Sequence, residues 1–62
     1  MLQLRIERVK KGLTQCDISM KTGIPQWRLS LLERGIPPLP EEAKKIAETL
    51  NADAKILFKP VV

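Results

Sequence analysis

The chain has few of the residues that small proteins use to build metal sites, disulfides or active sites. Of its 62 residues one is cysteine, none is histidine and none is tyrosine. A single cysteine cannot form an internal disulfide, and zinc sites draw mainly on cysteine and histidine. Histidine is also the most frequent general base in enzymes. We therefore expect Cys16 to be a small apolar residue on a helix, and we expect neither a cofactor nor an enzyme activity.

Long apolar runs and targeting signals are missing as well. The longest uninterrupted apolar segment is far shorter than the roughly 20 residues that cross a bilayer. The first residues, Met1 to Leu4, lack the layout of a signal peptide. We expect a single domain over residues 1–62 that remains in the cytoplasm and has no membrane partner.

The composition is that of a chain that folds around a core. Hydrophobic residues make up 44% and charged residues 29%, which differs from the composition of disordered chains. Eleven lysines and arginines against seven acidic residues give a formal net charge of +4. A basic surface of this size attracts polyanions, so nucleic acid or an acidic protein surface is the expected partner.

Hydrophobic spacing and the placement of glycine and proline predict five short helices and no sheet. The predicted ranges are 2–11, 15–22, 25–34, 40–50 and 54–58. Apolar residues at positions 2, 6, 9 and 13, with Leu4 beside them, follow the helical period that predicts the first range. In the fourth, the buried stripe is expected to be Ala43, Ile46, Ala47 and Leu50.

Several of the helix ends carry residues whose chemistry favours a boundary. Thr14 and Asp17 have the spacing of a capping box, although Asp is a weaker partner than Glu. Gly23 and Asn51 suit left-handed helix ends, and Pro40 suits a first helical position. The boundaries therefore do not depend on hydrophobic spacing alone.

Two short helices joined by a glycine-containing turn, from Thr14 to Gly23 and from Pro25 to Gly35, are typical of a helix-turn-helix. This run resembles the helix-turn-helix of phage repressors and Cro proteins. The matching positions are Gly12, Leu13, Thr14, Gln15, Ile18, Ser19, Gly23, Ile24, Leu29, Ser30, Leu32, Glu33 and Gly35, with Arg8 upstream and Ile46, Ala47 and Leu50 downstream. The resemblance implies an all-α, five-helix, lambda-repressor-like domain that binds duplex DNA, regulates transcription and lies at the nucleoid. A homodimer on a palindromic operator is the expected assembly, and no small-molecule ligand is indicated.

The third predicted helix supplies most of the expected DNA contacts. If Leu29 faces the core, a step of about 100° per residue turns Trp27, Leu31 and Arg34 away from it, with Gln26 and Ser30 at the flanks. Glutamine can pair with adenine, and arginine with guanine or phosphate. The resemblance adds Gln15 as a phosphate contact. The predicted DNA-binding residues are Gln15, Lys21, Gln26, Trp27, Arg28, Ser30, Leu31 and Arg34.

Glu33 falls on the apolar side of the third helix, beside Leu29 and Leu32. A buried carboxylate requires a partner. The resemblance supplies Arg8, whose guanidinium could hold Glu33 in a bidentate pair between the first and third helices. The alternative is that the two charges are solvated separately.

Two features depart from the repressor pattern and weaken the expectation of DNA binding. Residues 36–38 are Ile-Pro-Pro, where the family often has lysine or arginine. Trp27 and Leu31 form an apolar pair on the outward face, as in a protein-interaction module such as an antitoxin-like or scaffold domain. Packing of Trp27 into the core is a third possibility. Ile56, Phe58, Val61 and Val62 are the apolar residues left to form a dimer surface.

Overall fold

The computed structural model describes residues 2–61 and contains five helices in this range. They are α1 (Gln3–Lys10), α2 (Gln15–Thr22), α3 (Gln26–Glu33), α4 (Pro40–Leu50) and α5 (Ala54–Leu57). Extended pairing within 2–61 is limited to one isolated antiparallel bridge between Leu2 and Pro60. None of the five helices is long and apolar enough to cross a membrane. The all-α prediction is confirmed, and the predicted helix ends differ from the observed ones by at most one residue.

The helix boundaries follow the local chemistry of the chain. The Thr14 hydroxyl accepts a hydrogen bond from the Asp17 N–H at 3.1 Å, and the Asp17 carboxylate accepts one from the Thr14 N–H at 2.9 Å. This reciprocal capping box starts α2. Gly23, with φ +79°, ends α2, and Asn51, with φ +52°, ends α4 in the same left-handed region.

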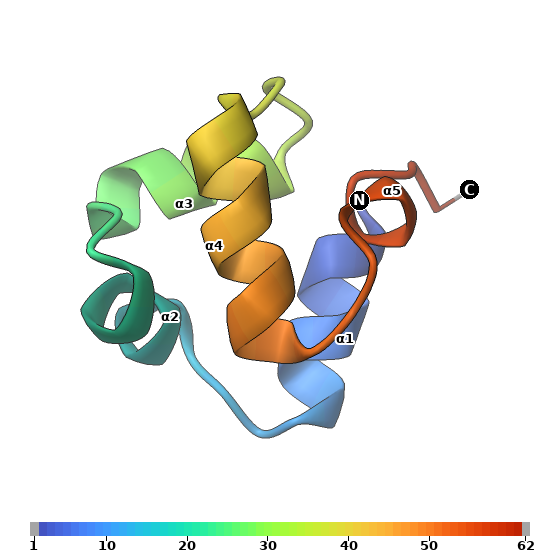
Figure 1. Cartoon of the computed structure of the whole chain (residues 1–62). Coiled ribbons are helices and arrows are strands. Elements are labelled where there is room, and N and C mark those ends of the chain that lie inside the picture. The colour runs from blue at the N-terminus through green and yellow to red at the C-terminus, as the bar shows by residue number, and fades with distance from the viewer. Residues whose placement is uncertain (1, 62) are drawn as a thin grey trace.

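The helices are arranged around α4. Figure 1 shows α4 through the middle of the molecule, with α2 and α3 on one side and α1 and α5 on the other. Side chains from all five helices and the flanking turns meet in one core: Leu2, Leu4, Ile18, Ile24, Leu29, Leu32, Ile46, Leu50 and Leu57. The stripe predicted for α4 is confirmed, because Ile46 and Leu50 are fully buried and the two alanines lie partly buried beside them.

The apolar positions expected along α1 are buried only in part. Leu2 and Leu4 are buried and Leu13 packs against the core, whereas Val9 is 59% exposed and Ile6 is only partly covered. Leu4 and Arg8 are four residues apart and therefore lie on the same side of the helix. Because Arg8 points toward α3, this side faces the interior, and the line through Ile6 and Val9 turns outward.

The chain ends lie together beside α1 and α5 (Figure 1). The Gln3 N–H donates to the Lys59 carbonyl at 3.0 Å, next to the bridge at Leu2. Of the apolar residues expected at a dimer surface, Ile56 is 50% exposed, but Phe58 packs against the core. Val61 is partly buried, and Val62 lies outside the described residues.

Candidate nucleic-acid interface

The turn between α2 and α3 is fixed by side-chain hydroxyls as well as by Gly23. The Ser19 hydroxyl donates to the Ile24 carbonyl at 2.6 Å. The buried Thr22 hydroxyl donates to the Ile18 carbonyl at 2.7 Å and accepts from the Ile24 N–H at 3.2 Å. In the sequence, Ser19 is one of the positions that match the repressor pattern. Its hydroxyl holds the chain that leads into α3.

The outward face of α3 carries the residues predicted to meet DNA. Leu29 is buried on the inner side, whereas Gln26 is exposed and the side chain of Trp27 is 68% exposed. Ser30 and Leu31 are partly exposed on the same helix. The exposure of Trp27 rules out its placement in the core. An apolar ring therefore lies at the surface, next to an amide that is free to hydrogen-bond.

Arg28 has an intramolecular partner that the sequence did not suggest. Its Nε donates to Glu42 Oε2 at 2.9 Å, and its Nη2 donates to Glu42 Oε1 at 2.9 Å and to the Pro37 carbonyl at 3.4 Å. The hydrogen bond with Glu42 raises the pKa of Arg28, and the one with Arg28 lowers the pKa of Glu42. The guanidinium predicted to reach DNA thus joins α3 to α4 instead.

Arg8 and Glu33 form an ion pair between α1 and α3. Arg8 Nε donates to Glu33 Oε2 at 2.8 Å and Nη2 donates to Oε1 at 3.3 Å, with 13% of the Arg8 side chain and 9% of the Glu33 side chain exposed. Arg8 Nη1 donates to the Leu13 carbonyl at 2.8 Å, so every nitrogen of the guanidinium has an acceptor. These contacts are incompatible with two separately solvated charges.

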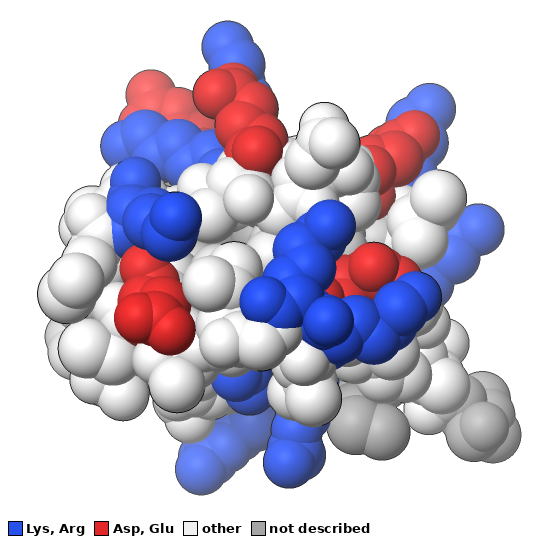
Figure 2. Space-filling view, turned by 90° about the horizontal axis from the view of Figure 1, so that it is seen from below, with Lys and Arg blue, Asp and Glu red and all other residues white. Residues whose placement is uncertain are grey.

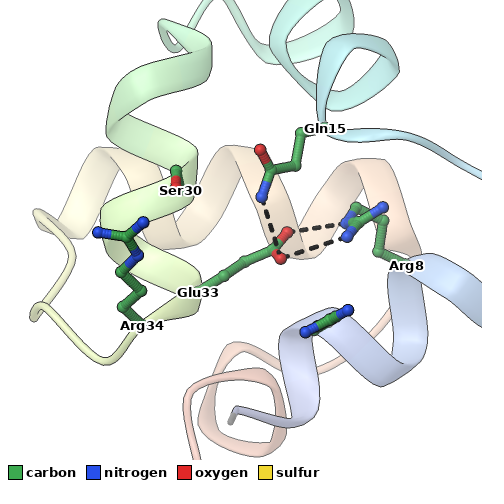
Figure 3. Close-up of a pocket in the computed structure, with 6 residues that line it drawn as sticks. Arg8, Gln15, Ser30, Glu33 and Arg34 are labelled. Carbon is green, nitrogen blue, oxygen red and sulfur yellow. Dashed lines mark hydrogen bonds and ion pairs between the residues drawn. The ribbon is translucent and has the colours of Figure 1, made fainter.

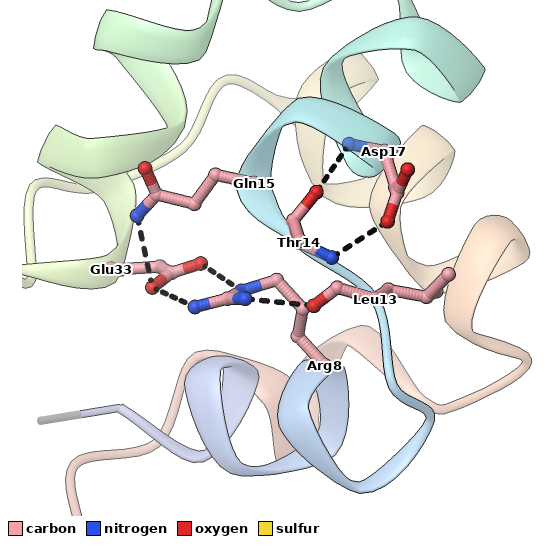
Figure 4. A network of polar contacts seen from close by, with 6 residues as sticks. All are labelled: Arg8, Leu13, Thr14, Gln15, Asp17 and Glu33. Carbon is pink, nitrogen blue, oxygen red and sulfur yellow. Dashed lines mark hydrogen bonds and ion pairs between the residues drawn. The ribbon is translucent and has the colours of Figure 1, made fainter.

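Gln15 joins this ion pair from the start of α2. Its amide Nε2 donates to Glu33 Oε1 at 3.2 Å (Figures 3 and 4). The capping box beside it lowers the pKa of Asp17, because the Thr14 backbone N–H and then its hydroxyl stabilise the carboxylate. Backbone N–H groups in the first turn of a helix have no acceptor within the helix, so those of Gln15 and Cys16 remain available to an anion.

Basic side chains are spread over the surface. In Figure 2 the acidic groups on the visible face lie beside basic ones, and further Lys and Arg side chains project along its lower edge. Lys21 on α2 and Arg34 at the end of α3 are exposed, as a role in phosphate binding requires. The loop at residues 36–39 is exposed at Ile36 and Leu39 and carries no charge. This loop therefore supplies no basic side chain to the interface.

The described residues do not gather the side chains of a metal site. No group of three His, Cys, Asp or Glu residues lies close enough within residues 2–61 to hold an ion. Cys16 lies on α2, as predicted, but it is exposed. We assign it no role in the interface.

Comparison with protein families agrees with this geometry. A family model described as Helix-turn-helix matches residues 4–57. The matched range begins on α1 and ends at the last residue of α5, so it includes both arginine–glutamate pairs and the whole outward face of α3. Searches of curated proteins and of solved structures find no match.

Proposed function

The chain belongs to the helix-turn-helix family of DNA-binding transcription regulators, and from that premise we propose that it reads duplex DNA sequence-specifically with α3 in the major groove. The observation that carries this proposal is the two-sided character of α3. Leu29 and Leu32 anchor one side in the core, while Gln26 and Trp27 are exposed on the other. The major groove is about 12 Å wide and admits one helix, whose outward side chains can reach the base edges.

The side chains of this face have different tasks in the proposal. The Gln26 amide pairs with a base, for which adenine has the matching donor and acceptor, and Trp27 packs on thymine methyl groups or sugars. Ser30 and Leu31 extend the same contact along the groove. Lys21 and Arg34 bind phosphates. Base identity is therefore read near the start of α3.

Two of the predicted contacts need adjustment in this arrangement. The Gln15 side chain is held by Glu33, so its phosphate contact comes from the backbone N–H groups at the start of α2. Arg28 is held by Glu42 and meets DNA only if it leaves that carboxylate. The first residues of α3, together with Lys21 on α2 and Arg34 after α3, then carry most of the contact.

We propose that two copies bind a palindromic operator as a homodimer. A single helix-turn-helix reads about one half-site, and two-fold symmetry of the protein matches two-fold symmetry of the site. Ile56 is the exposed apolar side chain on α5 that is available to such a contact. Analytical ultracentrifugation with and without the operator tests the assembly separately from DNA binding.

Selection of binding sites from random duplexes, followed by titration of three variants, tests the proposed function. Gln26→Ala should lose about 1–3 kcal/mol on the selected site and little on random DNA, because a bidentate amide contact recognises one base. Lys21→Gln should weaken both duplexes alike, since phosphate contacts carry no sequence information. Trp27→Ala should fold normally and change the selected sequence. If no sequence is enriched by the folded protein, the proposal is wrong.

A protein-interaction module is the second candidate, because Trp27 is a large apolar side chain exposed on a helix. The salt dependence of binding separates the two functions. Affinity for DNA falls steeply as counterions are added, whereas an apolar contact with a protein persists at high salt. Loss of a salt-resistant protein partner in Trp27→Ala, with DNA binding unchanged, favours the second function.

A further inference from the structure

A shallow apolar groove runs along the outward side of α1. This α1 groove has a volume of about 490 Å³ and is lined by Arg5, Ile6, Val9 and Lys10, all of which belong to α1. Figure 1 shows α1 at the edge of the molecule, beside α5. We propose that the α1 groove binds an amphipathic helix of another protein, in which aspartates or glutamates flank the apolar residues. Such a contact is additional to DNA binding and does not depend on it.

The floor of the α1 groove is apolar and faces away from the core. Leu4 marks the buried side of α1, with 1% of its surface exposed. At about 100° per residue, Ile6 and Val9 lie about 160° and about 140° from Leu4, on either side of the outward direction. Val9 is 59% exposed and Ile6 is only partly covered. Two branched apolar side chains therefore form a surface that the fold of residues 2–61 leaves open.

The α1 groove has a positive charge on each side. Arg5 lies about 100° from Leu4 in one direction and Lys10 about 120° in the other, so the apolar floor falls between them. Arg5 is exposed, and within residues 2–61 it has no acidic group at ion-pair distance. Lys10 meets Glu7 only at 3.6 Å, and its side chain is 65% exposed. Both cations are therefore available to carboxylates of a partner.

This arrangement of charge selects the occupant. A second copy that docked through the same face would bring two positive rims together, and like charges across an interface disfavour such a contact. A helix with apolar residues every three or four positions matches the floor formed by Ile6 and Val9. Carboxylates on the two sides of that helix match Arg5 and Lys10. Contact between two single helices buries less area than a standard interface, so we expect a transient complex.

The α1 groove and the outward face of α3 can be occupied at the same time. Arg8, on the same side of α1 as Leu4, reaches Glu33 on α3 at 2.8 Å. The side of α1 that faces α3 is therefore the one opposite to the groove. If α3 lies in the major groove as proposed, a helix bound to α1 would be held beside the DNA. This consequence rests on the proposed function, whereas binding at α1 does not.

Two synthetic peptides and the ¹⁵N-labelled full chain test the proposal. Each peptide has about 18 residues, enough to form a helix, with leucines at helical spacing. Glutamates flank the leucines in the acidic peptide, and lysines replace the glutamates in the control peptide. The acidic peptide should shift the amide signals of Ile6, Val9 and Lys10, and the lysine peptide should not. Binding that leaves these signals in place, or no binding, would overturn the proposal.

A substitution in the floor tests the apolar contact. Val9→Ser should weaken binding of the acidic peptide about tenfold, because it removes a buried apolar side chain from the complex. Valine and serine have similar helix propensities, so α1 should persist, and thermal melting checks the fold. Met20→Ser is the control, because it removes an exposed apolar side chain from α2. Equal affinities of Val9→Ser and wild type would show that the peptide binds elsewhere.

A double substitution in the rim tests the charge. Arg5→Gln with Lys10→Gln should weaken binding of the acidic peptide about fivefold, as expected for two exposed ion pairs. Lys44→Gln with Lys45→Gln is the matched control, because it removes the same charge from exposed positions on α4. Equal losses in the two double variants would mean that net charge alone attracts the peptide, contrary to the proposal.

Two further measurements identify a different occupant. If dilution of the protein alone moves the signals of Ile6 and Val9, a second copy occupies the α1 groove. If a DNA duplex moves them and the acidic peptide does not, this face belongs to the DNA-binding surface. Either result overturns the assignment to an acidic helix. Because the peptides are titrated without DNA, a failure of the proposed function leaves this test intact.

Discussion

Two arginine–glutamate pairs hold α3, one near each end, and they differ in their surroundings. Arg8 and Glu33 tie the last turn of α3 to α1, whereas Arg28 and Glu42 tie its first turn to α4. The shortest N–O distances are similar, at 2.8 and 2.9 Å. The first pair also contacts the Leu13 carbonyl and the Gln15 amide. The second pair is more exposed, with 21% of the Arg28 side chain accessible.

We take the enclosed pair to be structural and the more exposed pair to be the one for which a DNA phosphate would compete in the proposed function. Arg8 has an acceptor for every nitrogen of its guanidinium and is partly enclosed, so its charge is committed to the fold. Arg28 lies on the helix proposed to enter the groove, and its guanidinium faces a carboxylate that a phosphate could replace. We therefore expect exchange with a ligand only at the end of α3 near Gln26, where Arg28 lies.

The largest expected effect comes from breaking the enclosed pair with Glu33→Gln. Glutamine keeps the shape of the side chain but leaves the Arg8 guanidinium without a counter-charge in a poorly solvated position. Loss of one partner from a buried pair typically costs about 3–5 kcal/mol, which is a large part of the stability of a small domain. Urea denaturation measures the loss, with the exposed Glu41→Gln as the control. A melting temperature within about two degrees of the parent would contradict the structural role.

Glu42→Gln should cost less stability than Glu33→Gln, and it should strengthen DNA binding. This change removes the carboxylate that holds Arg28 and frees the guanidinium to reach phosphate. Affinity for random duplex should rise, and the salt slope should steepen by about 1. Glu41→Gln is again the matched control, because it removes the same charge from the neighbouring position. Equal gains in both variants would mean that bulk charge is responsible and that Arg28 is not a contact.

Local chemistry made the helices predictable from the sequence. The capping box at Thr14, the left-handed positions at Gly23 and Asn51, and Pro40 at the start of α4 all depend on residues close in the chain. The partner of Glu33 could also be predicted from the sequence. A carboxylate on the apolar side of a helix needs a counter-charge, and the repressor pattern offers Arg8.

Features that depend on how the helices are placed could not be predicted in this way. Glu42 meets Arg28 across 14 residues of sequence and an irregular loop, so no local pattern links the two. Arg5 and Arg34 line one pocket only because α1 lies beside the end of α3. The spacing of Ile6 and Val9 did not show their burial, because Val9 is exposed and Ile6 only partly covered, whereas Leu4 beside them is buried. A helix with apolar residues on two sides does not reveal which side is buried.

The smallest expected effect is a change in acid stability, and it measures the Arg28–Glu42 pair without DNA. The pKa of Glu42 lies below its ordinary value of 4.5, first because Arg28 donates a hydrogen bond to the carboxylate, and further because the Leu39 N–H does so as well. The unfolded chain therefore takes up this proton at a higher pH than the folded chain. The stability that the pair contributes is fully present above pH 4.5 and is lost as the pH falls through the lowered value. Wild-type protein should lose more stability than Glu42→Gln between about pH 6 and about pH 2, as measured by thermal melting at each pH. NMR titration of the Glu42 carboxyl carbon supplies the independent check, and a pKa at or above the ordinary value would show that Arg28 leaves this carboxylate in solution and is already free to bind another anion.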